Sequence, residues 1–387
     1  MLPTAVVSRR GADRLRAGHP WVYQSDVLRV EAEPGDLVRV ESDRDRRLGV
    51  AFWSSTSQIA LRFVASEPPS DERAFFRERL RAAIEYRRSL EIDGDAYRLV
   101  HGEADRLPAL IVDRYGDYLV VQTLSQGADR RIDLFVDLLV ELVHPQGILA
   151  RNDPKVRRLE GLDERVDVRF GEVPERMDVR EGNIRFHVDV RHGQKTGLFL
   201  DQRENHQVAA RYARGRGLDA FTYNGGFALP MAARCDSVVA LDSSAPALAL
   251  TRENAAWNGI GNLELREANV FDELRELEVS NERFDTIVLD PPAFAKNRAA
   301  VERAVAGYKE INLRALKLLA PGGHLITCSC SYNVSEALFG DIVSEAARDA
   351  RVTVSLVEKR LQARDHPVLL NVPETYYLKC LVLRRLP

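Results

Sequence analysis

Cysteine is scarce in this chain, since four thiols among 387 residues are too few and too scattered for a disulfide framework. No paired Cys-x-x-Cys spacing indicates zinc. No uncharged apolar run approaches the ~18 residues that a membrane-spanning helix needs, and residues 1–10 lack the apolar core of a signal peptide. The sequence therefore predicts a cytoplasmic protein with reduced thiols, and argues against a membrane protein or a secreted disulfide scaffold.

Lysine is scarce as well, because only seven of the 55 basic residues are lysine. The formal net charge of −3 is unfavourable for a protein that coats nucleic acid without discrimination. A local basic patch can nevertheless grip RNA. A hydrophobic content of 45% with 29% charged residues is typical of a globular protein. The length of 387 residues exceeds one ordinary core and predicts two or three domains.

Periodicity and turn residues divide the chain into three predicted domains. Residues 1–68 contain short strands separated by turns, which indicates a small β-barrel. Residues 71–180 combine an amphipathic helix over 71–90, a hairpin over 110–122 and a helix over 132–143, which indicates an α+β domain. The whole is expected to be a multidomain α/β protein.

The third predicted domain, 181–387, alternates strands and helices, the pattern of a parallel Rossmann-like sheet. Its last two strands, 352–357 and 375–386, are separated by a proline-containing loop without helical period, so we expect them to pair as an antiparallel edge. The other expected strands are 217–221, 237–241, 263–267, 284–289 and 323–327, and the expected helices include 245–258 and 299–319.

Three candidate ligand-binding residues follow the first three strands of this sheet, at the edge where such folds bind ligands. Glycine at Gly225 lets the backbone approach a ligand closely, although a simple tight turn explains it equally well. Asp242 ends the second strand, where a carboxylate can bind both ribose hydroxyls; the alternative is a helix N-cap. Asn269 ends the third strand and can bind an adenine amino group or form a turn. The motif is not G-x-G-x-x-G, which disfavours a dinucleotide.

Asp290 and Cys330 end the next two strands and should meet in the same crevice. A thiolate adds to C6 of cytosine and makes C5 nucleophilic, and an acid near N3 assists that addition. We therefore predict methylation at cytosine C5, with Cys330 as nucleophile and Asp290 as its partner. The alternatives are a merely buried thiol and a role for Cys328 in place of Cys330. Phe294 either stacks on a base or packs.

Several motifs together resemble the RlmI/RlmO group of bacterial 23S rRNA cytosine-5 methyltransferases over nearly the whole chain. The motifs are Gly18-His-Pro-Trp21, Pro34-Gly-Asp36, the stretch 97–116, Asn152-Asp-Pro-Lys155, Glu160-Gly161, Gln194-Lys-Thr-Gly197, Leu200-Asp-Gln-Arg203, Tyr223-Asn-Gly-Gly-Phe227, Asp290-Pro-Pro and Ser329-Cys-Ser331.

The resemblance implies a PUA-like RNA-binding barrel over 1–68, the central domain of that family over 71–180, and a class I methyltransferase domain over 181–387 that uses S-adenosyl-L-methionine. It also implies the residues that contact this cofactor. These are Gln194, Lys195, Phe221, Tyr223, Asn224, Gly225, Asp242, Asn269 and Asp290. That family more often has an acid at the position of Asn269.

The predicted partner is 23S rRNA or a precursor of the large subunit. Basic and aromatic residues of the barrel form the predicted RNA patch, unless the tryptophan is core and the arginines are only solvated. These residues are Arg9, Arg10, Arg14, His19 and Trp21. The spacing within 101–105 is not that of a metal-ligand set, so we expect no metal. An exposed strand edge in the central domain would allow a homodimer.

Two other functions compete with this interpretation. A nitrogen methyltransferase of the same fold needs no thiol, but such enzymes commonly carry an aromatic residue directly after (Asp/Asn)-Pro-Pro, where this chain has Ala293. A non-catalytic RNA-binding assembly factor would keep the fold without the acid, the thiol and the glycines.

Overall fold

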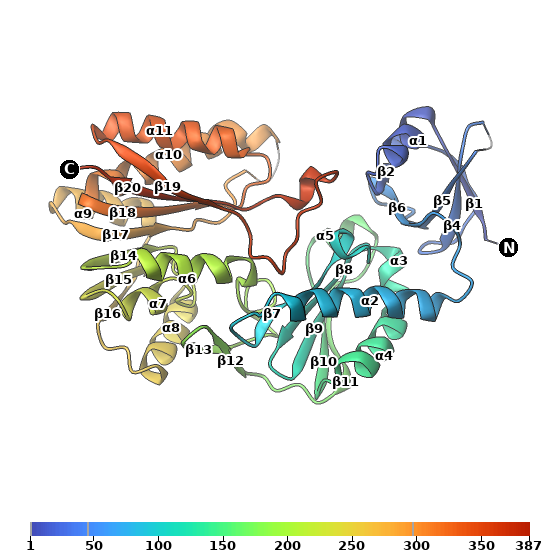
Figure 1. The fold of residues 1–387 in the computed structure, drawn as a ribbon, viewed down its shortest axis with the longest axis horizontal. Coiled ribbons are helices and arrows are strands. Elements are labelled where there is room, and N and C mark those ends of the chain that lie inside the picture. The colour runs from blue at the N-terminus through green and yellow to red at the C-terminus, as the bar shows by residue number, and fades with distance from the viewer. Residues whose placement is uncertain (1, 45, 296–297) are drawn as a thin grey trace. The chain divides into compact units, whose positions relative to one another are not determined.

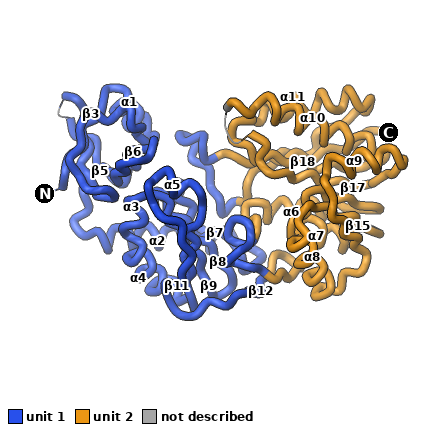
Figure 2. The backbone as a smooth tube through the Cα atoms, turned by 180° about the vertical axis from the view of Figure 1, so that it is seen from behind, with its two compact units in different colours: residues 1–179, 188–197, 364–375 blue, residues 180–187, 198–363, 376–387 orange. Residues whose placement is uncertain are grey.

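The computed structural model describes residues 2–44, 46–295 and 298–387. The chain folds into two compact units (Figure 2). Unit 1 contains residues 1–179, 188–197 and 364–375, and unit 2 contains residues 180–187, 198–363 and 376–387. Two short segments of the range 181–387 thus belong to unit 1. The division into three domains over 1–68, 71–180 and 181–387 stays a prediction, because two compact units do not test these boundaries.

The first sheet of unit 1 has six strands in the order β2-β6-β5-β4-β1-β3. Its elements are β1 (Thr4–Val7), α1 (Arg9–Arg16), β2 (Trp21–Tyr23), β3 (Val27–Val30), β4 (Leu37–Ser42), β5 (Arg47–Trp53) and β6 (Ile59–Ala65). The sequence predicts strands over 21–23, 36–40, 47–53 and 58–64, which correspond to β2, β4, β5 and β6, but it misses β1, β3 and α1. Each missed strand has four residues, too short for a clear alternation, and α1 buries only Gly11 and Ala12.

The second sheet of unit 1 has five strands in the order β11-β10-β9-β8-β7. The strands are β7 (Ala96–His101), β8 (Leu110–Tyr115), β9 (Tyr118–Thr123), β10 (Gly147–Asn152) and β11 (Arg165–Gly171). The helices are α2 (Glu72–Ser89), α3 (Gln126–Asp129), α4 (Ile132–Val143) and α5 (Val156–Leu159). The predicted hairpin is confirmed, since Tyr115 pairs with Tyr118 across a two-residue turn. Phe76 of α2 and Phe135 of α4 meet edge to face in the core beneath it.

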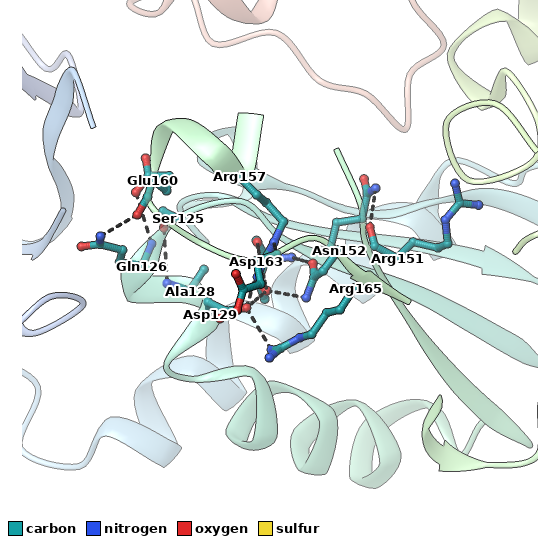
Figure 3. A network of polar contacts seen from close by, with 12 residues as sticks. Ser125, Gln126, Ala128, Asp129, Arg151, Asn152, Arg157, Glu160, Asp163 and Arg165 are labelled. Carbon is teal, nitrogen blue, oxygen red and sulfur yellow. Dashed lines mark hydrogen bonds and ion pairs between the residues drawn. The ribbon is translucent and has the colours of Figure 1, made fainter. Parts of the chain in front are cut away.

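A buried polar network in unit 1 includes Asn152 and Glu160, two residues of the sequence motifs (Figure 3). The carboxylate of Glu160 is 1% exposed, and it accepts hydrogen bonds from Ser54 Oγ at 2.6 Å and from Arg62 Nη2 at 2.9 Å. Nearby, Asn152 Oδ1 accepts from the backbone N of Thr123 at 2.8 Å. Asn152 and Glu160, from the motifs Asn152-Asp-Pro-Lys155 and Glu160-Gly161, therefore serve packing within unit 1, since their polar groups are satisfied by neighbouring strands and loops.

Unit 2 is built on a seven-stranded sheet in the order β16-β15-β14-β17-β18-β20-β19 (Figure 1). Its strands are β14 (Arg216–Ala220), β15 (Ser237–Asp242), β16 (Leu263–Glu267), β17 (Phe284–Leu289), β18 (Leu319–Ser329), β19 (Val354–Arg360) and β20 (Lys379–Arg385). The first five are parallel, and β20 runs antiparallel to both neighbours. The predicted antiparallel edge is confirmed. A separate two-stranded sheet pairs β12 (Met177–Glu181) with β13 (Ile184–Val188).

Helices cover both faces of the seven-stranded sheet (Figure 1). They are α6 (Arg203–Tyr212), α7 (Ala228–Ala232), α8 (Ala245–Trp257), α9 (Val270–Val279), α10 (Val301–Leu318) and α11 (Glu336–Ala350). Leu325 belongs to the core formed with α9, α10 and α11, whereas its neighbour Ile326 belongs to the core formed with α6 and α7. Successive side chains of a strand point to opposite faces, so a sheet buried on both faces needs apolar residues at both. The predicted multidomain α/β fold is confirmed.

No helix within residues 2–44, 46–295 and 298–387 combines the length and the apolar character needed to cross a membrane.

Candidate active site

The loop after β14 has a strained backbone at the carboxyl edge of the sheet. Phe221 and Tyr223 have positive φ angles of 70° and 50°, and Gly225 has φ 88°. A non-glycine residue in this region costs about 1–3 kcal/mol and persists where its surroundings hold it, often at a binding site. A Cβ at Gly225 would lie 2.9 Å from Thr251 Cγ2, so glycine is needed here for space as well as for conformation.

The carboxylate of Asp242 ties this loop to the end of β15. Its Oδ2 accepts from the backbone N of Tyr223 at 2.8 Å, and its Oδ1 accepts from the backbone N of Ser244 at 2.9 Å. The helix N-cap that we considered for Asp242 is instead Ser244, whose side chain accepts from Ala247 N. An ionised carboxylate has about four lone-pair sites, so two bonds leave acceptor capacity for ribose hydroxyls.

Asn269 is the N-cap of α9, whereas its sequence context indicated an adenine contact or a turn. Its Oδ1 accepts from the backbone N of Phe271 at 2.9 Å, and the residue is exposed. Phe294 contacts Phe271 and Tyr308, with ring centroids 5.8 and 4.7 Å apart, so it packs within unit 2. The contact of Asn269 with adenine stays a prediction.

The two cysteines at the end of β18 occupy different environments. Cys328 is fully buried and pairs with Cys380 across β18 and β20. Its hydrogen bond with Cys380, together with burial, raises the pKa of the Cys328 thiol well above its usual value. Cys330 lies just beyond the strand and is only partly buried, and its Sγ is 3.8 Å from the carbonyl oxygen of Pro291. A thiol that resists ionisation is a poor nucleophile, so Cys330 is the better candidate.

The carboxylate of Asp290 is held by a chain of side-chain hydrogen bonds. Gln202 Nε2 donates to Asp290 Oδ1 at 2.8 Å, and Asn205 Nδ2 donates to Gln202 Oε1 at 2.6 Å. Arg360 Nε in turn donates to Asn205 Oδ1 at 2.9 Å. Each amide is thereby oriented by its neighbour, and the donor end of Gln202 points at Asp290. Cys330 Sγ approaches the carbonyl oxygen of Pro291, the residue after Asp290, at 3.8 Å. The joint role of Asp290 and Cys330 stays a prediction.

Three buried ionisable groups lie beneath the loop after β14. Burial, reinforced by the charge of Asp290, raises the pKa of Asp219 to about 7. Although burial opposes a charged imidazole, the carboxylate of Glu181, 2.7 Å from His206 Nδ1, raises the pKa of His206 overall. The imidazole of His206 lies directly against Gly226, where a Cβ would be 2.8 Å from its Cε1.

Gln194 and Lys195 belong to unit 1, whereas the other residues that we expected at the cofactor belong to unit 2. Their segment is anchored by Thr196, whose Oγ1 donates to Asp113 Oδ2 at 2.7 Å and contacts Tyr115 OH at 2.9 Å. Lys195 has a positive φ of 52°. The role of both residues at the cofactor stays a prediction.

The residues of the predicted RNA patch differ in accessibility. The side chains of Arg9 and Arg10 on α1 are 82% and 68% exposed. Arg14 stacks its guanidinium 4.4 Å from the ring centre of Tyr23. Trp21 is partly buried and donates from Nε1 to Glu103 Oε1 at 2.9 Å.

His19, the fifth residue of this patch, is also partly buried. Its ring meets that of Trp21 edge to face at 5.5 Å, and its Nε2 lies 3.4 Å from Glu374 Oε2. The exposed arginines suit a phosphate backbone, while the two rings have structural partners. RNA binding by these five residues stays a prediction.

Two residues beside the site were not singled out from the sequence. Gln202 lies within one of the recognised motifs, but nothing in that motif indicates that its amide faces Asp290. Lys379 is one of only seven lysines and precedes four apolar residues of β20, and this unusual placement was the signal that the sequence offered. Lys379 lies beside Ser331, the residue after Cys330, because β18 and β20 pair.

Comparisons with known proteins agree with this architecture. A family model described as S-adenosylmethionine-dependent methyltransferase matches residues 157–384, and a PUA-like domain model matches residues 6–66. A relative from Aeromonas hydrophila named ribosomal RNA large subunit methyltransferase I is 42% identical over 377 residues, covering 95% of each chain. A relative of the same name from Vibrio cholerae is 40% identical and covers 97% of this chain and 98% of its own.

Solved structures support the fold. A methyltransferase crystallised with SAH covers 99% of this chain and 100% of its own, with a TM-score of 0.86 at 20% identity. A SAM-dependent methyltransferase from Streptococcus mutans has the same coverage and identity, with a TM-score of 0.84. The expected cofactor and the resemblance drawn from the motifs are thus confirmed. The chain belongs to the S-adenosylmethionine-dependent methyltransferase family, together with the proteins named ribosomal RNA large subunit methyltransferase I.

Proposed function

We propose that this protein methylates C5 of a cytosine in large-subunit 23S rRNA through a transient bond between Cys330 Sγ and C6 of the base. The observation that carries the proposal is the 3.8 Å separation between Cys330 Sγ and the carbonyl oxygen of Pro291, directly after Asp290. Because β17 and β18 are neighbouring parallel strands, a thiol and a carboxyl group follow adjacent strand ends, and covalent activation of a pyrimidine needs these two groups. The names of the relatives support rRNA of the large subunit as the substrate.

The residues present fit S-adenosyl-L-methionine, which when bound supplies an electrophilic methyl group. Asp242 would bind the ribose, because its carboxylate lies at the end of β15 and has acceptor capacity left. The tightly turned backbone over 221–225 would hold the methionine end, since no side chain at Gly225 keeps a ligand away.

The chain's own residues account for activation and release of the base. The Cys330 thiolate forms a bond to C6, and the electron pair of the C5–C6 double bond shifts toward C5 and the ring nitrogen N3. Asp290, in its protonated form, stabilises that charge by donating a hydrogen bond or its proton to N3, from a position fixed by Gln202. After C5 is methylated, a base removes the C5 proton, the double bond re-forms, and the bond between Sγ and C6 breaks to return the thiolate.

The test uses unmodified 23S rRNA containing 5-fluorocytosine, S-adenosyl-L-methionine and the full-length protein. Fluorine at C5 cannot leave as a proton, so the covalent complex should accumulate and survive denaturing electrophoresis. We expect the adduct with the wild type and with Cys328→Ala, and its loss in Cys330→Ala. Cys328→Ala is a matched control, because it removes a thiol two residues away that faces Cys380.

Other outcomes would change the proposal in defined ways. Loss of the adduct in Cys328→Ala alone would move the nucleophile to that residue. Methyl transfer to ordinary rRNA without any adduct would support a nitrogen methyltransferase. Calorimetry that shows no binding of S-adenosyl-L-methionine would favour an assembly factor without catalysis.

RNA recognition is assigned in the same proposal to a PUA-like barrel over 1–68. The exposed Arg9 and Arg10, with Arg14, His19 and Trp21, would contact the phosphate backbone and an unpaired base. A double Arg9→Ala, Arg10→Ala variant should bind rRNA fragments more weakly and with a shallower salt dependence. Unchanged affinity at every salt concentration would remove these two arginines from the RNA surface.

A further inference from the structure

Lys379, the first residue of β20, is a buried lysine beside the proposed nucleophile. The residue is 2% exposed, and it pairs with Ser329 across β18 and β20. Its Nζ donates to the carbonyl oxygen of Ser331 at 2.7 Å and to that of Tyr377 at 2.9 Å. The ammonium therefore binds the backbone carbonyl of Ser331, the residue directly after Cys330.

The charge of this lysine lacks a carboxylate partner. Within residues 2–44, 46–295 and 298–387, no Asp or Glu forms an ion pair with Lys379, and its two hydrogen bonds go to neutral carbonyls. Glu336 acts on it electrostatically, but that carboxylate already binds Lys359 and Tyr376 OH, each at 2.7 Å. A buried ammonium without an anionic partner is costly, and burial accordingly lowers the pKa of Lys379 to about 8.

Ionisation of Cys330 would supply the missing negative charge. The anion of this thiol favours the charged form of Lys379 more strongly than Glu336 does. Such interactions are reciprocal, so a charged lysine must also favour the thiolate. Two acidic groups belong to residues beside Cys330: Asp290 precedes Pro291, whose carbonyl oxygen is 3.8 Å from Cys330 Sγ, and Tyr308 OH is hydrogen-bonded to Ser331 Oγ at 2.9 Å. A carboxylate at Asp290 opposes a second negative charge nearby, and Lys379 offsets that effect.

We propose that Lys379 is a positioning residue whose ammonium holds the backbone after Cys330 and stabilises the thiolate form of that cysteine. This proposal rests on the proposed function in that Cys330 is taken to be the nucleophile. Its physical content, a thiol that ionises near neutral pH because of one buried lysine, can be measured without RNA.

The experiment follows alkylation of the full-length protein by iodoacetamide across a pH series, with tandem mass spectrometry assigning the label to Cys330 or to one of the three buried cysteines, because Cys328 lies on the same peptide. Only the thiolate reacts, so the midpoint of the rate profile reports its ionisation. We expect a wild-type midpoint below about 8, against about 8.5 for an ordinary cysteine. Lys379→Met should raise the midpoint by about one pH unit, a tenfold loss of thiolate near neutral pH.

Two further variants separate charge from structure. Lys379→Arg keeps the positive charge and should keep a midpoint within about half a unit of the wild type. Lys317→Met removes a lysine on α10 that binds Glu278 at 2.7 Å, and should leave the profile unchanged. A thermal melt checks folding, and the wild-type profile decides the question if Lys379→Met does not fold.

A wild-type midpoint of 8.5 or above would overturn the proposal. So would an unchanged midpoint in a folded Lys379→Met variant, or equal rises in the Met and Arg variants. These results are independent of the 5-fluorocytosine adduct. A low wild-type midpoint without any RNA adduct would leave Lys379 as the thiolate partner and reject cytosine methylation through Cys330. An adduct with an ordinary midpoint would support cytosine methylation and reject the role of Lys379.

Discussion

The side-chain amide of Gln202 lies 2.8 Å from the carboxylate of Asp290, with its Nε2 donating to Oδ1. The opposite end of the same amide accepts from Asn205 Nδ2. Because both ends are engaged, one oxygen of Asp290 is fixed on the protein and the orientation of its carboxyl plane is set. A hydrogen bond across about 3 Å to a reacting base depends on such orientation.

Substitution of Gln202 should therefore impair turnover more than cofactor binding. Gln202→Leu removes the donor, and Gln202→Glu adds a second carboxylate that must share a proton with Asp290 or be repelled by it. We expect kcat to fall by about tenfold or more in both variants, with the larger loss in Gln202→Glu. Single-turnover methylation of unmodified rRNA at saturating S-adenosyl-L-methionine would measure this.

Asn205→Ala provides a graded control for Gln202, because it keeps the Gln202 amide in place but removes the side chain that orients it. It should reduce the rate less than Gln202→Leu does. Full activity in Gln202→Leu at every pH would show that Asp290 needs no such support.

A methyl group at Gly225 should weaken binding of S-adenosyl-L-methionine. The added Cβ would meet Thr251 Cγ2 at 2.9 Å and Leu229 Cγ at 3.0 Å, in a residue with φ 88°. Gly259→Ala is a matched control, since Gly259 has φ 67° and no atom within 4 Å of its ideal Cβ. Both variants should lose about 1 kcal/mol of stability from backbone strain.

Only Gly225→Ala should raise the dissociation constant measured by calorimetry, by about tenfold, which corresponds to ~1.4 kcal/mol. Equal affinities in the two variants would mean that the loop after β14 does not approach the cofactor.

The alternation of strands and helices sufficed to predict the sheet of unit 2, because central strands such as β15 and β17 are largely apolar and buried on both faces. The predicted ranges 263–267 and 284–289 coincide with β16 and β17. Unit 1 was harder, because α1 has only eight residues, most of them charged, and buries only Gly11 and Ala12, so it offers few apolar residues by which a helix can be recognised.

The partners of the site residues could not be predicted from the sequence. Asp290 and Cys330 were predicted to meet because each ends a parallel strand, a local property. Gln202 binds Asp290, 88 residues further along the chain, and Arg360 binds Asn205 across 155 residues. Both hydrogen bonds depend on tertiary packing. The assignment of Gln194 and Lys195 to unit 1 likewise depends on long-range contacts of their segment.

Removal of the charge of Glu160 should destabilise unit 1 strongly. Glu160→Gln leaves the guanidinium of Arg62, 8% exposed, without its closest carboxylate, which lies 2.9 Å away. Breaking a buried pair by removing one partner costs about 3–5 kcal/mol. Glu164→Gln is the surface control, since Glu164 pairs with Arg158, which is 68% exposed, and such pairs contribute about 0–1 kcal/mol. Urea unfolding of both variants would compare them, and equal midpoints would contradict a structural role for the network of Figure 3.

The buried carboxyl of Asp219 should make the protein less stable as pH rises. Burial, with the nearby charge of Asp290, raises the pKa of Asp219 from 3.8 to about 7 in the folded protein. Between these two values the folded state holds a proton that the unfolded state has lost, so the free energy of unfolding decreases with increasing pH. His206, whose pKa is also raised, contributes in the same direction, with stability that is present at low pH and lost as pH rises through its folded pKa.

Asp219→Asn isolates the contribution of this carboxyl, because the amide keeps an acceptor for Thr222 Oγ1, now 2.6 Å from Asp219 Oδ2, and cannot ionise. The melting temperature of the wild type should fall between pH 5 and pH 8 more steeply than that of Asp219→Asn. Asp236→Asn, at an exposed position before β15, should leave the wild-type slope unchanged. If Asp219→Asn and the wild type lost stability in parallel over this range, the carboxyl would already be ionised at pH 5, and its burial beside Asp290 would have to be compensated by a donor other than Thr222.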